Sequence, residues 1–405
     1  MTEMRPFKRL LSREAAMGII AANIQRIDRT ESIPLEEAQY RVLAEDAVAD
    51  FDVPPFDRSA MDGYTAKAED TYGASTFHPK RLRLVGVQHA GDLFQAELKN
   101  GECVQVATGS PVPRGSDAVV MVENTKSSGG EVEVHQPVYP GANISPRGED
   151  IKRGDVVVRG GEYLTPGKVG ALAALGMKAA LVYVKPTVAV ISTGSEVRPL
   201  GEELGAGEIY DINSYTLTSI IQAHGCVPER LGIVPDEPEA IRMALIEGAK
   251  RDLVVLSGGS SVGTRDLLLD AVEELGKVLF HGLHVKPGKP TLFGVVEGKP
   301  VFGMPGNPTS CLSNAYLFLI PALRIAAGLP PHEPGQVKAR MASRMVASSG
   351  REQFITVRLE GGSAHPVFKK SGAITSMTHA DGYIVVPVDV DVIEEGEEVT
   401  VTLFG

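Results

Sequence analysis

Two lysines flank a rigid turn in the segment 284–290, HVKPGKP. Because the prolines fix φ and the glycine permits a tight turn, Lys286 and Lys289 are expected to lie close together. Paired lysines are most often solvated surface charges. Here they follow a predicted extended run close to a glycine-rich loop, which favours an anion-binding role.

That loop is SGGSSVG at 257–263, between a buried apolar run, 252–256, and a helix that begins near Asp266. Such a loop exposes backbone N–H groups and lets a phosphate approach closely. The spacing is neither the GxGxxG nor the Walker pattern, so it predicts phosphate binding without naming the ligand. An equally supported alternative is a tight turn with Asp266 as the helix N-cap. The candidate phosphate-binding residues are Ser257, Gly258, Gly259 and Gly263.

A third turn, MPGNP at 304–308, leads into a predicted helix. The positive end of the helix dipole attracts anions, so Pro305, Gly306 and Asn307 are candidate substrate contacts. A plain turn explains the same residues equally well.

Two carboxylates follow predicted buried or extended strands: Glu196, in the stretch STGSE at 192–196, and Asp236. Asp236 and Glu239 also fit the capping-box pattern, and from the residues alone this structural interpretation is favoured. His281 and His284 are three apart on an extended segment and point to opposite faces, so a zinc pair is not expected.

The elements that must position these residues alternate between strand and helix from 187 to 327. The pattern predicts a largely parallel sheet with helices on both faces, whose ligands bind beyond the carboxyl ends of the strands. The predicted helices are 214–224, 238–250, 266–275 and 308–327, and the predicted strands are 187–192, 230–234, 252–256 and a hairpin of 292–296 with 301–303.

The flanking regions differ from this unit. A helix capped by Ser12 and a second helix from Pro34 to Leu43 are predicted at the N-terminus. A β-rich module follows over 51–147, with a hairpin of 119–122 and 132–134 around Gly129-Gly130. A period-two pattern over 331–405 predicts a small β domain.

Composition limits the function. The chain has 405 residues with 51 acidic and 40 basic side chains, a formal net charge of −11. That field repels phosphate backbones and argues against nucleic-acid binding. The three cysteines, Cys103, Cys226 and Cys311, are too far apart in sequence for a metal knuckle and favour a reducing, cytoplasmic location. No signal peptide or membrane span is expected, because the best candidate, 311–329, contains Asn314, Pro321 and Arg324.

Taken together, these stretches resemble the molybdopterin molybdenumtransferases of the MoeA type, a family that is also seen as the E domain of gephyrin. The resemblance spans nearly the whole chain in order. It is carried by PPFDRSAMDGY (54–64), TGSPVP (108–113), RGED (147–150), STGSE (192–196), YDINS (210–214), SGGSSVGTRD (257–266), KPGKP (286–290), MPGNP (304–308), Gly350-Arg351 and SGAITS (371–376).

The resemblance implies a multidomain α/β fold. Its centre is a three-layer αβα molybdopterin-binding domain, similar to the adenylyltransferases, at 185–330. An elongated helical and mixed domain is expected from 1–50 plus 148–184, with the β-rich domain 51–147 inserted in it. A C-terminal small β-barrel is expected at 331–405.

The resemblance also implies the reaction: insertion of molybdate into adenylylated molybdopterin with release of AMP, assisted by Mg²⁺. The 257–263 loop would hold the phosphate and nucleotide end, and Lys286 and Lys289 would neutralise oxyanion charge. Glu196, Asp236 and Asp266 would bind Mg²⁺ or orient water and molybdate. Residues for first capture of molybdate would be Arg351, Ser371 and Ser376.

Family members are homodimers with a shared cleft, so Asp62, Thr108 and Asp150 are expected to close the site from the second subunit. Further implied partners are molybdopterin adenylyltransferase and molybdoenzymes or their chaperones. Three alternatives stay open: a tungstate-inserting paralogue, a non-catalytic gephyrin-like scaffold, and adenylylation of molybdopterin itself.

Overall fold

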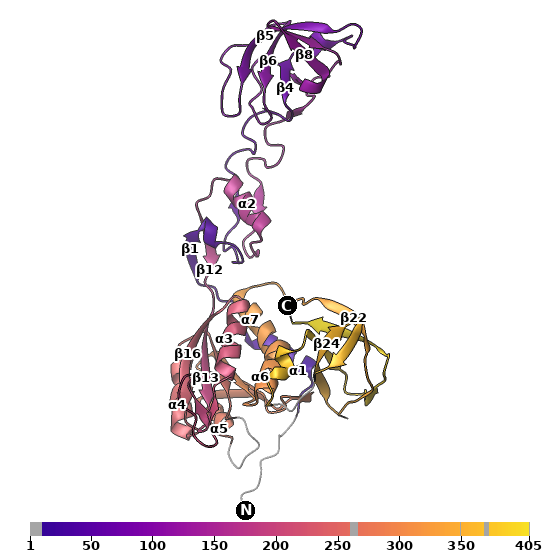
Figure 1. Ribbon diagram of the computed structural model, residues 1–405. Helices are drawn as coiled ribbons and strands as arrows, with labels where there is room; N and C mark the ends of the chain where they lie inside the picture. The colour runs from indigo at the N-terminus through magenta and orange to yellow at the C-terminus, as the bar shows by residue number, and fades with distance from the viewer. Residues whose placement is uncertain (1–9, 260–265, 349, 368–371, 405) are drawn as a thin grey trace, which may run out of the picture. The chain divides into compact units, whose positions relative to one another are not determined.

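The computed structural model describes residues 10–259, 266–348, 350–367 and 372–404 (Figure 1). Its contacts divide the chain into two compact units. The first comprises Met1–Glu31, Tyr40–Val42 and Leu181–Gly405, and the second comprises Ser32–Gln39 and Leu43–Ala180. The finer domain boundaries expected from the sequence stay predictions.

A six-stranded sheet in the order β16-β13-β17-β21-β20-β18 forms the centre of the first unit. The first four strands are parallel and the last two antiparallel, as the alternation of strands and helices predicts. Their bounds are β13 Thr187–Thr193, β16 Val227–Val234, β17 Leu253–Ser257, β18 Gly276–His281, β20 Leu292–Val296 and β21 Lys299–Met304.

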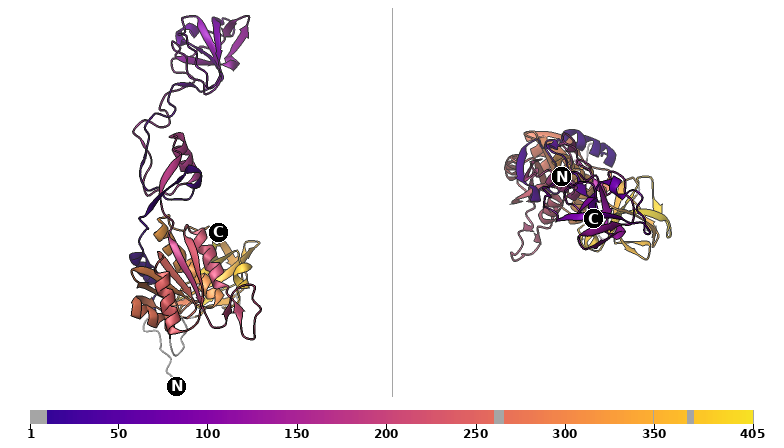
Figure 2. Two further views of the ribbon diagram at one scale, coloured as in Figure 1. Left: turned by 90° about the vertical axis from the view of Figure 1, so that its left-hand side faces the viewer. Right: turned by 90° about the horizontal axis from the view of Figure 1, so that it is seen from above.

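Helices cover both faces of this sheet, which Figure 2 shows with the strands between them. The helices are α1 Arg13–Asn23, α3 Asn213–Ala223, α4 Pro238–Gly248, α5 Leu267–Leu275, α6 Pro308–Asn314 and α7 Ile320–Ala327. Alternate strand residues face opposite layers: Val188 and Val190 pack with α1, α3, α6 and α7, while Ala189 and Ile191 pack with α4 and α5. The predicted three-layer αβα domain is therefore confirmed.

The expected long helix over 308–327 contains one irregularity. A wide π-type turn at Ala315–Leu319 separates α6 from α7, just before Pro321, which has no backbone N–H to donate. Within the described residues this is the one helix long and apolar enough to cross a membrane, but 72% of its apolar window is buried. Cys311, Phe318 and Leu323 are fully inaccessible, so it is a core helix of the first unit.

A closed barrel forms the C-terminal part of the first unit, as expected. Its strands β24, β25, β22, β28 and β26 pair in that order, and β26 returns to β24. A short strand, β19 (Val285–Lys286), joins β24 from the central domain. The barrel strands are β22 Gln336–Met341, β24 Glu352–Glu360, β25 Ser363–Pro366, β26 Gly382–Val386 and β28 Glu398–Leu403, beside the pair β23 Met345–Val346 and β27 Val392–Ile393 and the helical turn α8 Thr375–Thr378.

The second unit contains a six-stranded sheet in the order β7-β4-β6-β5-β9-β8. These strands are β4 Gly63–Ala66, β5 Lys80–Gln88, β6 Glu102–Val106, β7 Ala118–Met121, β8 Thr125–Ser128 and β9 Glu131–Val134. This unit also contains the pairs β2 Ala47–Val48 with β11 Val156–Val158 and β3 Arg58–Ser59 with β10 Ile144–Ser145, the helix α2 Pro166–Ala174, and short 3₁₀ turns at Leu35–Glu37, Ala68–Thr71 and Val122–Asn124. The ribbon of β1 Thr30–Pro34 and β12 Ala179–Tyr183 contains residues of both units.

Two local predictions are wrong. The helix expected from Pro34 to Leu43 is a single 3₁₀ turn, Leu35–Glu37, because Tyr40 takes a left-handed φ of 64° that no helix accommodates. The hairpin around Gly129-Gly130 joins β8 to β9, whereas the expected partner, Val119–Val122, overlaps β7, which pairs with β4. Both glycines have positive φ, which fits the turn itself.

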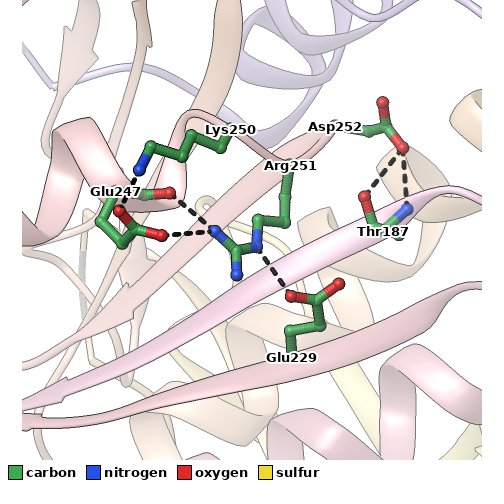
Figure 3. A network of polar contacts seen from close by, with 6 residues as sticks. All are labelled: Thr187, Glu229, Glu247, Lys250, Arg251 and Asp252. Atoms are coloured by element: carbon green, nitrogen blue, oxygen red, sulfur yellow. Dashed lines mark hydrogen bonds and ion pairs between the residues drawn. The ribbon is translucent and has the colours of Figure 1, made fainter.

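A buried carboxylate ties the start of the central sheet to the N-terminal segment. Asp252 lies just before β17 and accepts hydrogen bonds from both terminal nitrogens of Arg29 at 3.0 and 2.7 Å. It also accepts from the backbone N–H and the hydroxyl of Thr187, at 2.8 and 3.0 Å (Figure 3). A neighbouring surface network joins Arg251 to Glu229 and Glu247.

We predict that Asp252→Asn lowers the free energy of unfolding by ~1–3 kcal/mol, because an amide cannot accept all four hydrogen bonds. Burial alone would raise the pKa of Asp252, but the bonds from Arg29 and Thr187 hold it below its usual value. The stabilisation is therefore present above about pH 4 and is lost as the pH falls through the lowered pKa. Urea unfolding of both proteins at pH 7 and at acid pH measures this difference.

The exposed pair Glu239–Arg242 provides the control. Glu239→Gln should leave the unfolding midpoint unchanged. An equal loss in both variants would contradict the special role of Asp252.

Candidate functional site

The carboxyl ends of three neighbouring parallel strands place the predicted loops together. Ser192 in β13 pairs with Ser257 in β17, and Ser257 pairs with Met304 in β21. The backbone N–H of Gly258 donates to the Met304 carbonyl at 3.1 Å. Thus the loops that begin at 194, 258 and 305 share one edge of the sheet.

Gly258 can only be glycine here. Its φ is +99°, and a Cβ would lie 2.5 Å from the carbonyl oxygen of Thr193. A Cβ on Gly306 would lie 3.5 Å from the Gly258 Cα, so the two turns are in direct contact. The backbone segments are therefore packed too closely at this point for a side chain on Gly258. Gly263 lies outside the described residues.

A buried acid supports this edge from the other side. Asp211 accepts a hydrogen bond from the Ser192 hydroxyl at 2.9 Å and from the backbone N–H of Ser214, in the first turn of α3, at 3.1 Å. Asn213 donates to the Gly306 carbonyl at 2.8 Å. The first turn of α3 is thus bonded both to the end of β13 and to the turn after β21.

A cleft of about 710 Å³ opens where β13 and β16 end. Its lining includes Ser195, Arg198, Asp211, Tyr215, Arg230 and Pro235. The guanidinium of Arg230 lies 4.2 Å from the centre of the Tyr215 ring. The cleft combines an aromatic face, two arginines and a buried carboxylate at the edge where open α/β sheets bind their ligands.

The three predicted Mg²⁺ ligands are not gathered into one cluster. Asp266 accepts from the Leu269 backbone N–H at 3.1 Å, and so is the N-cap of α5, and its other oxygen lies 3.1 Å from Nε2 of His281. Glu196 and Asp236 are exposed beside the cleft. Among residues 10–259, 266–348, 350–367 and 372–404, no group of three or more His, Cys, Asp or Glu side chains is placed to hold a metal ion.

The capping interpretation of Asp236 is wrong. The N-cap of α4 is Glu237, which makes no side-chain capping bond, and Pro238 begins the helix. Asp236 therefore lies one residue before the N-cap, and Glu239 is the second helical residue rather than the third that a capping box requires. Asp236 is exposed just after the end of β16.

The lysine turn is fixed by the core helix α6. Gly288 has a φ of +103°, and Asn314 donates from its amide to the Gly288 carbonyl at 2.8 Å. A Cβ on Gly288 would lie 2.3 Å from that amide nitrogen, so no larger residue fits. The backbone N–H of Leu283 donates to the Lys289 carbonyl at 2.9 Å and closes the turn. As predicted, the two lysines flank a rigid turn.

Residues of the C-terminal barrel lie beside this turn. Lys286 in β19 pairs in register with Gln353 in β24, so Arg351 is two residues from the pairing partner of Lys286. Ser376 is placed differently: it is 1% exposed and donates to the Ala373 carbonyl at 2.9 Å, which favours a structural role over anion capture. Ser371 lies outside the described residues.

In the second unit, the three motif stretches converge. Ser59 donates from its backbone N–H to the Ser110 carbonyl and accepts from Gly109, both at 2.8 Å, and Gly148 donates to the Pro54 carbonyl at 2.9 Å. Asp150, which follows this contact, is exposed.

Asp62 and Thr108 meet at the surface of the second unit. One oxygen of Asp62 accepts from the Thr108 backbone N–H at 2.6 Å and from its hydroxyl at 2.9 Å. These two bonds, the backbone one first, hold the pKa of Asp62 below its usual value. The carboxylate is therefore ionised at neutral pH.

A three-layer molybdopterin-binding domain followed by a small barrel is the class that this fold and site define, and the comparisons agree. Residues 11–176 match the MoeA N-terminal region (domain I and II), 189–325 a probable molybdopterin binding domain, and 338–404 the MoeA C-terminal region (domain IV). The chain belongs to the MoeA family.

Individual relatives extend along nearly the whole chain. A putative molybdopterin biosynthesis protein of Methanocaldococcus jannaschii is 34% identical, with 99% of this chain and 100% of that protein covered. The molybdopterin molybdenumtransferase of Haemophilus influenzae is 33% identical, with 93% and 94% covered. A crystal structure of the molybdopterin biosynthesis MoeA protein from Pyrococcus horikoshii is 36% identical, covers 98% of this chain and 100% of its own, and has a TM-score of 0.84. The family and the enzyme class, molybdopterin molybdenumtransferase, are as the sequence predicts.

Sequence reasoning missed several residues of the site. Asp211 and Asn213 lie in the YDINS stretch, but the residues alone indicate no role for them, and Tyr215 and Arg230 come together only through the packing of α3 on β16. The sequence raises His281 only as a possible zinc ligand, whereas it faces Asp266.

We predict that Gly258→Ala lowers both thermal stability and nucleotide binding, since the added Cβ strains the backbone and meets Thr193. Strain of this kind costs of the order of 1–3 kcal/mol. Differential scanning fluorimetry with and without an adenine nucleotide measures both effects. Gly18→Ala, in α1 with no heavy atom within 4 Å of the new Cβ, should keep or raise stability and leave binding unchanged.

Proposed function

We propose that this chain inserts molybdate into adenylylated molybdopterin and releases AMP. The observation that carries the proposal is the shared sheet edge, where the Gly258 turn, the Gly306 turn and the Asp211-supported cleft adjoin. A phosphate-binding turn beside a cleft with an aromatic face and arginines suits a substrate that combines phosphate with a planar ring system.

In this proposal the backbone N–H groups of the turn hold the phosphate end, and the cleft takes a ring of the substrate. Lys286 and Lys289 bind the molybdate oxyanion, and Arg351 assists its capture. During the reaction the two dithiolene sulfurs bind molybdenum and give up their protons, and one molybdate oxygen leaves with them as water. Water attacks the phosphoanhydride bond, so that AMP leaves and the phosphate stays on the molybdopterin. Fixed positive charge next to the reacting oxygens stabilises the negative charge that develops there.

The Mg²⁺ requirement stays a prediction of the family resemblance. Because Asp266 caps α5 and the described carboxylates form no cluster of three, we assign no reaction step to the ion. Titration of AMP release with Mg²⁺ after chelation tests the requirement.

We further propose a cytoplasmic homodimer in which Asp62, Thr108 and Asp150 of one subunit close the cleft of the other. The bonds from Thr108 hold Asp62 ionised and oriented, as a residue that acts on a partner's substrate must be. Molybdopterin adenylyltransferase, molybdoenzymes and their chaperones are the proposed further partners.

Tungstate insertion is the second candidate, because two ammonium groups on a rigid turn do not distinguish two tetrahedral oxyanions of similar size. A pure scaffold is less consistent with a turn and a cleft that only a ligand would use. Adenylylation of molybdopterin is less consistent with the barrel contribution to the lysine turn.

The direct test is AMP release from adenylylated molybdopterin by the purified full chain, with molybdate or tungstate. We expect molybdate-dependent release. Release with tungstate alone would support the paralogue, and no release with either oxyanion would overturn the proposed reaction.

We predict that Asp62→Asn abolishes cofactor formation while folding and subunit assembly stay intact, because Asp62 is exposed and its loss leaves no cavity. The measurement pairs the AMP-release assay with size-exclusion chromatography. Asp70→Asn, on the same unit, is the control for a general charge effect. A fully active Asp62→Asn protein would refute the assignment.

A further inference from the structure

The strand that carries Lys286, β19, connects the central domain to the C-terminal barrel. β19 follows β18 of the central domain, yet its hydrogen-bonding partner is the barrel strand β24, with Val285 opposite Glu352 and Lys286 opposite Gln353. The Glu352 backbone N–H donates to the His284 carbonyl at 2.9 Å, and the His284 ring nitrogen Nδ1 lies 3.3 Å from the Gly350 carbonyl. The backbone under Lys286 is therefore anchored on the barrel.

The side chain of Lys286 is anchored there as well. Its ammonium donates a hydrogen bond to the hydroxyl of Ser348, which is 62 residues further along the chain. Ser348 follows Ala347, a residue of the barrel core, so its backbone is attached to a packed structure. An ammonium has three N–H donors, and one fixed bond leaves two whose directions are then restricted.

A flexible lysine must lose rotamer freedom when it binds an anion, and this loss weakens binding. A bond that already holds the ammonium in the free protein removes part of that cost.

We propose that Ser348 is a positioning residue that holds the Lys286 ammonium for the oxyanion substrate. The inference rests on the proposed function, in which Lys286 binds molybdate. Ser348 acts through Lys286 and does not itself touch the oxyanion. The C-terminal barrel thereby contributes to oxyanion affinity through a residue outside the motifs of the sequence analysis.

The experiment measures molybdate binding to the full chain by isothermal titration calorimetry, together with the molybdate KM and kcat. We expect Ser348→Ala to weaken binding and raise the molybdate KM about three- to tenfold, as the loss of one hydrogen bond predicts, with kcat and the KM for adenylylated molybdopterin nearly unchanged. Ser348→Thr keeps the hydroxyl and should restore affinity to within about twofold. Ser343→Ala, an exposed serine of the same barrel, is the matched control and should bind as the parent does.

A double-mutant cycle with Lys286→Gln separates positioning from a direct or a general effect. If Ser348 acts through Lys286, Ser348→Ala has no further effect in the Lys286→Gln protein. An equal loss in both backgrounds, or unchanged molybdate affinity in Ser348→Ala, overturns the inference while the proposed function stands. If Lys286→Gln itself binds molybdate normally, the anion-binding role in the proposed function fails, and the inference with it.

Thermal unfolding of each variant distinguishes positioning from loss of fold. We expect the midpoints of Ser348→Ala and Ser343→Ala to agree. If Ser348→Ala does not fold, Ser348→Cys provides the same comparison, since the thiol keeps the size of the side chain but is a weak acceptor. Parent-like molybdate affinity in a folded Ser348→Cys protein would also overturn the inference.

Discussion

The register between β13, β17 and β21 is the constraint on which the candidate site depends. It sets Ser192, Ser257 and Met304 in one row, so the turns that follow these strands begin at one edge. The register is in turn held by apolar side chains on both faces, since Val190 and Val255 pack against one helical layer and Ile191 and Leu256 against the other. A slip of one residue would exchange the two faces and separate the turns. The same strand register therefore determines both the packing of the core and the position of the turns at the candidate site.

Positively charged side chains gather locally at the candidate site, although the whole chain has a net negative charge. A net charge of −11 opposes the approach of anionic substrates at long range. The local arrangement compensates at contact distance, with two lysines on a rigid turn and arginines in the cleft. Such groups act within the ~8 Å over which physiological salt leaves charges unscreened. Recognition in this protein thus depends on close geometry more than on electrostatic steering.

The sequence predicts the central domain well because its signals are local. Buried apolar runs, glycines at strand ends and prolines at helix starts define the parallel sheet, and the Gly258 and Gly288 turns occur where the residues indicate. The failures have physical causes. Tyr40 adopts a left-handed backbone conformation that the sequence pattern does not indicate, and α4 begins at Pro238, one residue later than an Asp236 cap requires. Asp266 is the N-cap of α5, one of its two sequence-based interpretations, since it accepts from the Leu269 backbone N–H. Its contact with His281 is not indicated by the sequence.

Contacts between distant segments were the least accessible from the residues. Nothing in the KPGKP stretch indicates that Asn314 fixes its glycine, or that its lysine pairs with a barrel strand and bonds to Ser348. Asp211 lies within the YDINS stretch, but its role as a hydrogen-bond acceptor at the end of β13 depends on the contact with the Ser192 hydroxyl. Motifs therefore predict many of the site residues, whereas the hydrogen bonds that hold these residues in place are found only in the three-dimensional structure.

The pairing of β19 with β24 has a consequence for the order in which the protein matures. A chain emerging from the ribosome presents Lys286 well before Ser348, and the barrel that carries Ser348 closes only when β28, at Glu398–Leu403, has been made. The parallel sheet and its glycine turn need no residue beyond 327 to assemble their strands. In the proposed function, the turn that would hold the phosphate is thus made early in synthesis, and the lysine that would bind the oxyanion is positioned among the last. An unfinished chain would then carry the glycine turn without the positioned lysine.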